Sequence, residues 1–87
     1  MAVRAIRMDP RDNVAVVTAE VKHGELLDAA GGDEVRAVEA IPRGGKVALT
    51  PIAAGEMVIR YGEGIGLATE DIAAGQHVHT HNLGDRG

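Results

Sequence analysis

The stretch Ile72-Ala73-Ala74-Gly75-Gln76-His77-Val78 repeats a pattern that occurs twice earlier in the chain, at residues 41–47 and 52–58. All three copies read Ile-x-x-Gly-x-x-Val. We expect each isoleucine to be buried, each glycine to take a positive φ in a tight turn, and each valine to point inward from the strand that follows. Pro42 supports this expectation, because it presets φ at the second position of its turn. The repeat therefore predicts a compact structure in which turns matter as much as strands.

The rest of the chain continues this alternation of short β-prone runs and turn residues. It predicts a turn at residues 9–13, where Asp and Asn side chains can bond their own backbone, and three strands, over residues 3–8, 14–21 and 35–40. Residues 23–33 fit either one helical turn or a loop, since they combine two leucines with three glycines. The predicted fold class is all-β: a compact coiled β domain with short turns and little helix, forming a single domain over residues 1–87.

The composition allows only a small core. The 87 residues include no Phe, no Trp and no Cys, and Tyr61 is the only aromatic residue among Phe, Trp and Tyr. Aromatic side chains usually dominate core energetics, and disulfides often compensate in small domains, so this chain lacks both contributions. We therefore expect an oligomer or a partner protein to supply part of its stability.

Charge and hydropathy argue against several classes of function. The formal net charge is −4, and the chain has neither a cluster of Lys and Arg nor aromatic residues to stack on bases, so we expect no nucleic-acid partner. The N-terminus lacks the apolar core of a signal peptide, and no apolar run reaches membrane-spanning length. We therefore expect a cytoplasmic location and no membrane partner.

Three histidines occupy alternate positions at the end of the third copy of the repeat: His77, His79 and His81. On a strand, alternate side chains share one face, and the repeat assigns the intervening valine to the core side. Same-face neighbours lie roughly 6.5–7 Å apart, so two imidazoles can meet one metal ion, whereas the third requires a bend. Imidazole also titrates near neutral pH and can act as an acid or a base. The residues alone leave three interpretations open: a metal or catalytic site, a partner interface, and ordinary surface residues.

Other polar residues are weaker candidates. Arg60 ends the strand of the second copy and could contact a carboxylate in a bidentate manner, and Lys46 could bind an anion, although a solvated side chain is the commoner outcome for each. Residues 12–13, Asp-Asn, are expected to shape a turn rather than a site. The glycine-rich stretch 62–66 does not predict dinucleotide binding, because no helical pattern with the required fingerprint follows it.

Taken together, these residues resemble the N-terminal SAF, or β-clip, domain of the altronate/galactarate dehydratase family. The resemblance is collinear over nearly the whole chain and rests on these stretches: Asp12–Val16, Ile41–Leu49, Arg60–Gly62 with Ile65–Gly66, and Gly75–Asn82. The ending His-Val-His-x-His-Asn is its most specific part. The resemblance implies a SAF/β-clip-like fold, which agrees with the turn-rich repeat. In this family the domain is fused to a larger catalytic domain or encoded separately, and this chain resembles the separate form, as in the small subunits of altronate dehydratase and sulfolactate sulfo-lyase.

The resemblance implies a two-subunit, metal-dependent lyase of which this chain is the small subunit, inactive alone. The expected reaction is the elimination of water from a sugar acid such as altronate or galactarate. The alternatives are sulfite elimination from sulfolactate and a non-catalytic β-clip ligand-binding module. A divalent metal, Fe²⁺ or Mn²⁺, shared with the large subunit, would polarise the substrate while a base removes the proton α to the carboxylate. The expected partners are a large dehydratase-like catalytic subunit and a small hydroxy-acid substrate.

The resemblance also implies site residues. We expect catalytic roles for three histidines: His77, His79 and His81. Two of them are expected to bind the metal: His79 and His81. Substrate binding is expected from three polar residues: Lys46, Arg60 and Asn82. Two positions depart from the family pattern, since Gly45 stands where relatives usually carry histidine and Arg60 where lysine is usual. If the missing histidine is catalytic, the substrate of this chain is shifted or its site is degenerate.

Overall fold

The computed structural model describes residues 3–29 and 33–85, which form eight β-strands and no helix. The predicted all-β class is therefore confirmed. The strands are β1 (Val3–Ile6), β2 (Val14–Val17), β3 (Leu26–Ala29), β4 (Asp33–Arg36), β5 (Lys46–Ala48), β6 (Met57–Arg60), β7 (Glu63–Leu67) and β8 (His77–Val78). Within the described residues, no helix is long and apolar enough to cross a membrane.

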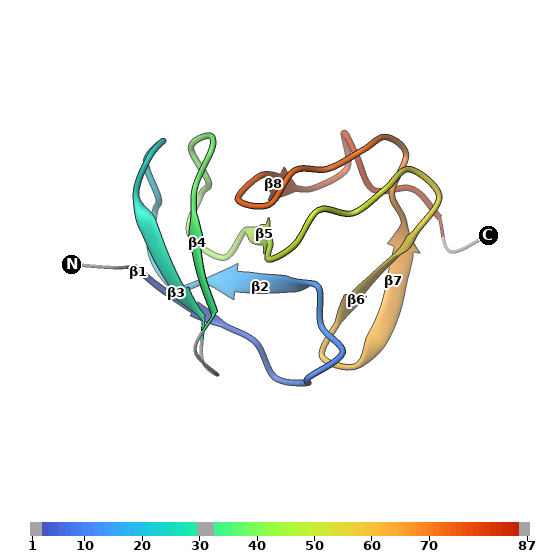
Figure 1. Ribbon diagram of the computed structural model, residues 1–87, viewed down its shortest axis with the longest axis horizontal. Helices are drawn as coiled ribbons and strands as arrows, with labels where there is room; N and C mark the ends of the chain where they lie inside the picture. The colour runs from blue at the N-terminus through green and yellow to red at the C-terminus, as the bar shows by residue number, and fades with distance from the viewer. Residues whose placement is uncertain (1–2, 30–32, 86–87) are drawn as a thin grey trace.

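Six of the strands form one curled sheet, in the order β4-β3-β1-β2-β5-β8, and β6 and β7 form a separate hairpin. β1 and β3 pair in parallel, whereas the other paired strands are antiparallel. In Figure 1 the β3–β4 hairpin lies towards one end of the molecule and the β6–β7 hairpin towards the other, with β2 and β5 between them. The principal extents of the molecule are 38 × 23 × 18 Å.

The predicted turn repeat is confirmed, and the structure adds a fourth copy. The glycines of the three predicted copies all take a positive φ, and their isoleucines and valines are at most 2% exposed. Gly24 has a φ of 89° and follows the same pattern, between the buried Val21 and Leu27. The sequence pattern did not reveal this copy, because Val21 stands at the isoleucine position and Leu27 at the valine position.

The copies arise because the chain winds twice along the same path with a period of 31 residues. The amide of Gly44 donates a hydrogen bond to the carbonyl of Val17, and 31 residues later the amide of Gly75 donates one to Ala48. The β2–β5 pair is repeated by the β5–β8 pair at the same interval. β8 therefore begins a third winding that no further strand of the described chain covers, and it lies at an edge of the sheet.

Several predicted element boundaries are wrong. Residues 26–29 form β3 rather than a helical turn or a loop, because β1 and β4 pair with them on either side. Residues 30–32 of that ambiguous segment lie outside the described part of the chain. The glycine-rich residues 63–67 form β7, which the sequence did not predict. The strands expected over residues 3–8, 14–21 and 35–40 are shorter or shifted, and are observed as β1, β2 and β4.

The predicted turn role of Asp12 and Asn13 is confirmed, and both residues also reach the β6–β7 hairpin. Asp12 is buried, and its carboxylate accepts hydrogen bonds from the amides of Asp9, at 3.1 Å, and Gly62, at 2.7 Å. The Asn13 Oδ1 atom accepts from the amide of Ile59, and its Nδ2 atom donates to a neighbouring carbonyl of β6. These side chains therefore attach the N-terminal turn to the second hairpin.

The core consists of two clusters of small aliphatic side chains. The first surrounds Ile41 and draws on β1, β2, β3 and β5. The second surrounds Ile52 and Ile72 and draws on β2, β5, β6 and β8. Val, Ile, Leu and Ala supply all members of both clusters, so each buried residue contributes less apolar area than an aromatic residue would.

Three of the four turns are closed by the side chain that follows the glycine. In the second of these three turns, Glu56 Oε1 accepts a hydrogen bond of 2.7 Å from the amide of Ala53. We expect Glu56→Ala to lower the free energy of unfolding by about 1 kcal/mol, because one exposed hydrogen bond to a charged acceptor is lost. Urea denaturation measures this change. Glu70→Ala is the control, because Glu70 is exposed and makes no hydrogen bond within the described residues; equal stability of both variants would contradict the prediction.

Candidate functional site

The predicted histidines lie at an edge of the six-stranded sheet, on β8 and the turn that follows it (Figure 1). The rings of His77 and His79 stack with centroids 5.5 Å apart and an angle of 6° between their planes. The ring of His81 lies 5.9 Å from that of His77 at 53°. Val78 is fully buried, as predicted. We call the cluster of His77, His79 and His81 the histidine face.

This cluster forms through a bend rather than through strand alternation. β8 ends at Val78, and residues 79–82 form a turn closed by a 3.0 Å hydrogen bond from the Asn82 amide to the His79 carbonyl. The prediction that one continuous strand carries all three histidines is therefore wrong. The bend nevertheless brings the third imidazole back beside the first, so the structure does bring the three predicted residues together.

The side chain of Asn82 holds the backbone of this segment. Asn82 is fully buried, its Oδ1 atom accepts a hydrogen bond of 2.9 Å from the His79 amide, and its Nδ2 atom donates one of 2.9 Å to the His77 carbonyl. The amide group thus replaces the neighbouring strand that β8 lacks on this edge. A substrate contact by Asn82 stays a prediction, because the structure shows its amide engaged with the main chain.

Glu39 belongs to the same cluster, and the sequence did not predict it. Its Oε2 atom accepts a hydrogen bond of 3.1 Å from the His77 amide, across 38 positions of the chain. Glu39 is half-buried and lies in the bend that follows β4. No spacing rule connects a glutamate in that bend with a strand so far along the chain, so this contact requires the three-dimensional structure.

Lys46 and Arg60 form a second, cationic part of the site. Lys46 lies on β5, opposite Val78 of β8, and burial together with the positive charge of Arg60 lowers the pKa of Lys46. The guanidinium carbon of Arg60 lies 5.4 Å from the centroid of the Tyr61 ring, and its buried Nε atom has no hydrogen-bond partner. Neither cation forms an ion pair with the residues that the structure describes.

Tyr61 directly follows Arg60 and lies in the turn at the tip of the β6–β7 hairpin. Its φ of 55° makes it the one non-glycine residue with a positive φ in the described chain, and Gly62 follows with a φ of 78°. Two consecutive positive φ values are typical of the tightest hairpin turns, where Asn or Gly normally precedes Gly. A tyrosine accepts backbone strain at this position, and its ring lies beside Arg60.

The environment of His77 lowers its pKa from the usual value of 6.5. Burial is the largest cause, and the neighbouring charges of His79, His81 and Lys46 act in the same direction, whereas Glu39 raises the pKa. A lowered pKa means that the unfolded chain binds the proton more readily than the folded chain does. Protonation of His77 therefore opposes folding as the pH falls below 6.5.

We expect NMR titration of the isolated chain to show His77 half-protonated below pH 6.5. We also expect Glu39→Gln to lower the midpoint further, because the carboxylate that favours the charged imidazole is removed. The ¹⁵N and ¹³C shifts of the ring report the protonation state directly. A His77 midpoint at or above 6.5 would contradict this assignment of its surroundings.

The histidine face of the described chain contains no complete set of metal ligands. No group of three or more His, Asp or Glu side chains within residues 3–29 and 33–85 is arranged to hold a metal ion. Because the His77 and His79 rings are nearly parallel, their in-plane nitrogen lone pairs do not converge on one point. The metal-binding role expected of His79 and His81 stays a prediction.

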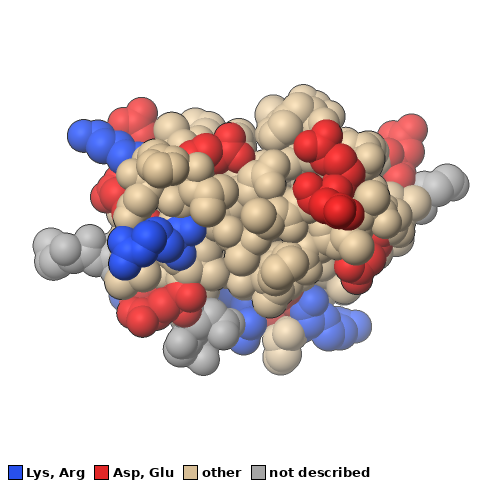
Figure 2. Space-filling model, turned by 45° about the horizontal axis from the view of Figure 1, so that its top comes forward, with Lys and Arg blue, Asp and Glu red and all other residues tan. Residues whose placement is uncertain are grey.

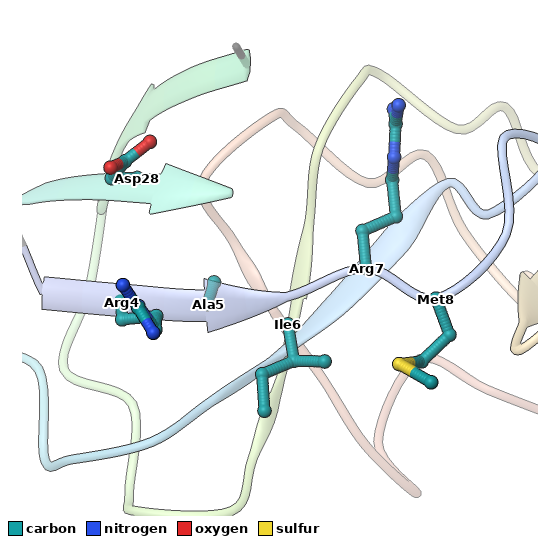
Figure 3. Close-up of a pocket in the computed structure, with 6 residues that line it drawn as sticks. All are labelled: Arg4, Ala5, Ile6, Arg7, Met8 and Asp28. Atoms are coloured by element: carbon teal, nitrogen blue, oxygen red, sulfur yellow. The ribbon is translucent and has the colours of Figure 1, made fainter. Parts of the chain in front are cut away.

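A separate groove of about 350 Å³ lies along β1 and contains none of the predicted site residues. Its lining comprises Arg4, Ala5, Ile6, Arg7, Met8 and Asp28. Figure 3 shows the Ile6 and Met8 side chains on one side of the β1 backbone and the Arg7 side chain on the other. The candidate site is therefore an exposed face and not this groove.

Figure 2 turns the upper side of Figure 1 forward and shows how charge is distributed. Lysine, arginine, aspartate and glutamate side chains gather mainly towards the two ends and the rim of this view, and uncharged side chains cover most of its middle. A surface of this kind leaves a broad uncharged area on which another protein can pack.

The fold and site define a class: a small coiled β domain that exposes clustered histidines and two unpaired cations beside an edge strand. A family model described as the altronate/galactarate dehydratase SAF domain matches residues 3–86. The chain therefore belongs to this family, and the family expected from the sequence is confirmed.

The relatives fall into two groups by length. The chain is 46% identical over 77 residues to altronate dehydratase of Escherichia coli (strain K12), covering 88% of this chain but only 15% of that protein. It is 36% identical over 77 residues to altronate dehydratase of Bacillus subtilis (strain 168), again 15% of that protein. By contrast, the match to (2R)-sulfolactate sulfo-lyase subunit alpha of Chromohalobacter salexigens is 36% identical and covers 95% of both chains. The chain is thus homologous to whole subunits or segments of lyases.

Proposed function

We propose that this chain is the small subunit of a two-subunit lyase and that its histidines and cations bind a small anionic hydroxy acid at the interface with a larger subunit. The observation that carries this proposal is the pair formed by Lys46 and Arg60. Burial lowers the pKa of Lys46, and the positive charge of Arg60 lowers it further; neither cation has a carboxylate partner among the described residues. Neighbouring unpaired cations are unfavourable until an anion neutralises them, so this face is suited to a carboxylate or sulfonate group.

The first candidate reaction is elimination of sulfite from sulfolactate. The support is the match over 95% of both chains to a sulfo-lyase alpha subunit, a protein of the same length class as this chain. In this reaction a base removes the proton from C2, the C3–S bond breaks, and the electron pair leaves with sulfite. The enol that remains takes up a proton at C3 and loses the proton of its C2 hydroxyl to give pyruvate. Sulfolactate carries a carboxylate and a sulfonate, so two cations match its charge.

The second candidate is the elimination of water from a sugar acid. The 46% identity to altronate dehydratase supports it, although that match spans only 15% of the relative. The chemistry is related, because a base again removes the proton α to a carboxylate and hydroxide leaves from the β-carbon with a proton. The two candidates therefore require the same face but a different leaving group.

The three imidazoles are the residues of this chain that can exchange protons with such a substrate. Because the pKa of His77 is lowered, its neutral form is favoured at neutral pH and can accept a proton. We also propose that a divalent metal, Fe²⁺ or Mn²⁺, is shared with the large subunit and that His79 and His81 are this chain's contribution to its site. When bound, such an ion supplies a Lewis acid that stabilises developing negative charge on the substrate.

Co-expression of the chain with a large dehydratase-like subunit tests the proposal. The purified complex is assayed with sulfolactate, altronate and galactarate in the presence of Fe²⁺ or Mn²⁺. Sulfite release that requires both chains supports the first candidate, and water elimination that requires both supports the second. If no complex forms and none of the three acids reacts, the proposal is wrong, and a non-catalytic ligand-binding module is the better account.

A further inference from the structure

The turn at residues 41–45 lacks the side-chain closure that its three counterparts share. In those turns the residue after the glycine accepts a hydrogen bond from the amide three positions earlier: Glu25 from Lys22, Glu56 from Ala53 and Gln76 from Ala73. At the corresponding positions of the turn at residues 41–45, Pro42 has no amide hydrogen and Gly45 has no side chain. Donor and acceptor are absent together, so no polar group is left unpaired by the change.

The space next to this turn is occupied by the imidazole of His77. A Cβ atom built on Gly45 would lie 3.1 Å from His77 Nε2, and 2.9 Å from both Ile41 Cγ2 and the Pro42 carbonyl oxygen. Gly45 is not among the glycines with a positive φ, so its backbone conformation suits any residue. Glycine is therefore needed here for close approach and not for conformation.

The same segment also holds the main chain of His77. Glu39 lies two residues before Ile41, and its carboxylate accepts the outward-facing amide of His77 at 3.1 Å. One short stretch thus fixes His77 twice, through its amide and through the position of its ring. The ring of His77 in turn contacts those of His79 and His81, so its position affects the whole histidine face.

We infer that residues 39–45 form a seat for His77 and that Glu39 and Gly45 are positioning residues of the histidine face. Glu39 bonds the amide of His77, and Gly45 leaves room for its ring, so both act on the position of His77. Gly45 also directly precedes Lys46 in the chain. The effect on catalysis rests on the proposed lyase function, whereas the effect on the position of His77 does not.

Four variants test the seat: Glu39→Ala removes the acceptor, Glu39→Gln keeps an oxygen there, Gly45→Ala adds the Cβ, and Glu25→Ala disturbs a neighbouring turn of the same kind. That turn bonds Ala37 and Ile41 but makes no hydrogen bond to His77 within the described residues. The first readout is the NMR spectrum of the full chain, in which the His77 amide and ring signals are followed. We expect them to move in Glu39→Ala and Gly45→Ala and to stay in place in Glu25→Ala.

The second readout is the activity of the two-subunit complex. We expect Glu39→Ala and Gly45→Ala to lower kcat by roughly 10- to 100-fold with little change in KM, because a misplaced catalytic group costs rate more than binding. Glu39→Gln should recover most of the loss, because the hydrogen bond to the His77 amide is retained. If Gly45→Ala does not fold, the two Glu39 variants decide the question.

The outcomes separate the seat from the proposed function. A wild-type complex that eliminates nothing overturns the proposed function, and the NMR readout then decides the seat alone. Unmoved His77 signals in Glu39→Ala overturn the seat even if the complex is active. Equal losses of kcat in Glu39→Ala and Glu25→Ala also overturn it, since they show a general effect of turn stability.

Discussion

Arg60→Gln is expected to lower kcat/KM of the two-subunit enzyme by roughly 100-fold, mainly through a higher KM, because a charge-assisted hydrogen bond to a substrate anion is lost. The guanidinium has no counter-charge among the residues that the structure describes. Its buried Nε atom has no partner, and the Tyr61 ring restricts its position. Lys46→Gln is expected to act in the same direction, and steady-state kinetics of the complex measure both effects.

Arg60→Lys and Lys22→Gln are the matched controls for this prediction. Arg60→Lys retains the charge and should recover most of the binding. Lys22→Gln removes one exposed positive charge from a remote turn and should leave the kinetics unchanged. If Arg60→Gln and Lys22→Gln lower kcat/KM equally, the effect is one of net charge and Arg60 does not contact the substrate.

The stability of Arg60→Gln distinguishes a binding role from a structural one. A partly buried cation without a counter-charge loses hydration, whereas its contact with the exposed Tyr61 ring is worth only about 0.5–1 kcal/mol. The neutral replacement should therefore unfold at nearly the same urea concentration as the wild type. Loss of activity together with a clear loss of stability would mean that Arg60 supports the hairpin rather than the substrate.

The turn repeat could be predicted from sequence because each of its positions has a local physical cause. The glycines follow from the positive φ of a tight turn, and the isoleucines and valines from burial on either side of it. The fourth copy, from Val21 to Leu27, could be recognised only in the structure. Its Val and Leu are buried as the Ile and Val of the other copies are, but they do not match the sequence pattern. The period of 31 residues was hidden for the same reason.

The two missed strands depend on partners that local sequence does not reveal. β3 is held by the N-terminal strand β1, whose residue Val3 faces Leu27 in a parallel pair. β7 contains two glycines, which are poor strand formers, and it exists because Met57 packs over Gly64 while Leu83 packs against Gly66. In both strands tertiary pairing overrides local propensity.

The candidate site was likewise predictable from sequence only in part. The histidines could be predicted to form a site because they lie at alternate positions of one short segment, which suggested a shared face. Their actual contact depends on the turn after β8, which Asn82 closes. The nearness of Lys46 to Arg60 and of Glu39 to His77 results from the second winding of the chain, so neither could be deduced from spacing.

Asn82→Ala is expected to lower the free energy of unfolding by about 3 kcal/mol, because it leaves the His79 amide and the His77 carbonyl without partners at a buried position. Asn13 provides a matched comparison within the same chain. Its side chain bonds the amide of Ile59 and the carbonyl of Met57 in the same two-point manner on β6, but it is only partly buried. Water can replace part of what Asn13→Ala removes, so we expect that variant to lose only about 1 kcal/mol.

Urea denaturation of the two alanine variants measures this difference, and Asn82→Asp shows which half of the contact matters. The aspartate retains the acceptor for the His79 amide but replaces the donor to the His77 carbonyl with a repelling oxygen, so it should be no more stable than the alanine variant. Equal losses in Asn82→Ala and Asn13→Ala would mean that burial does not strengthen the contact. A larger loss at Asn82, accompanied by movement of the His77 and His79 amide signals, would mean that one buried amide does for β8 what a neighbouring strand does elsewhere in the sheet. The Asn82 side chain would then determine the arrangement of the histidine face without any need to contact the substrate.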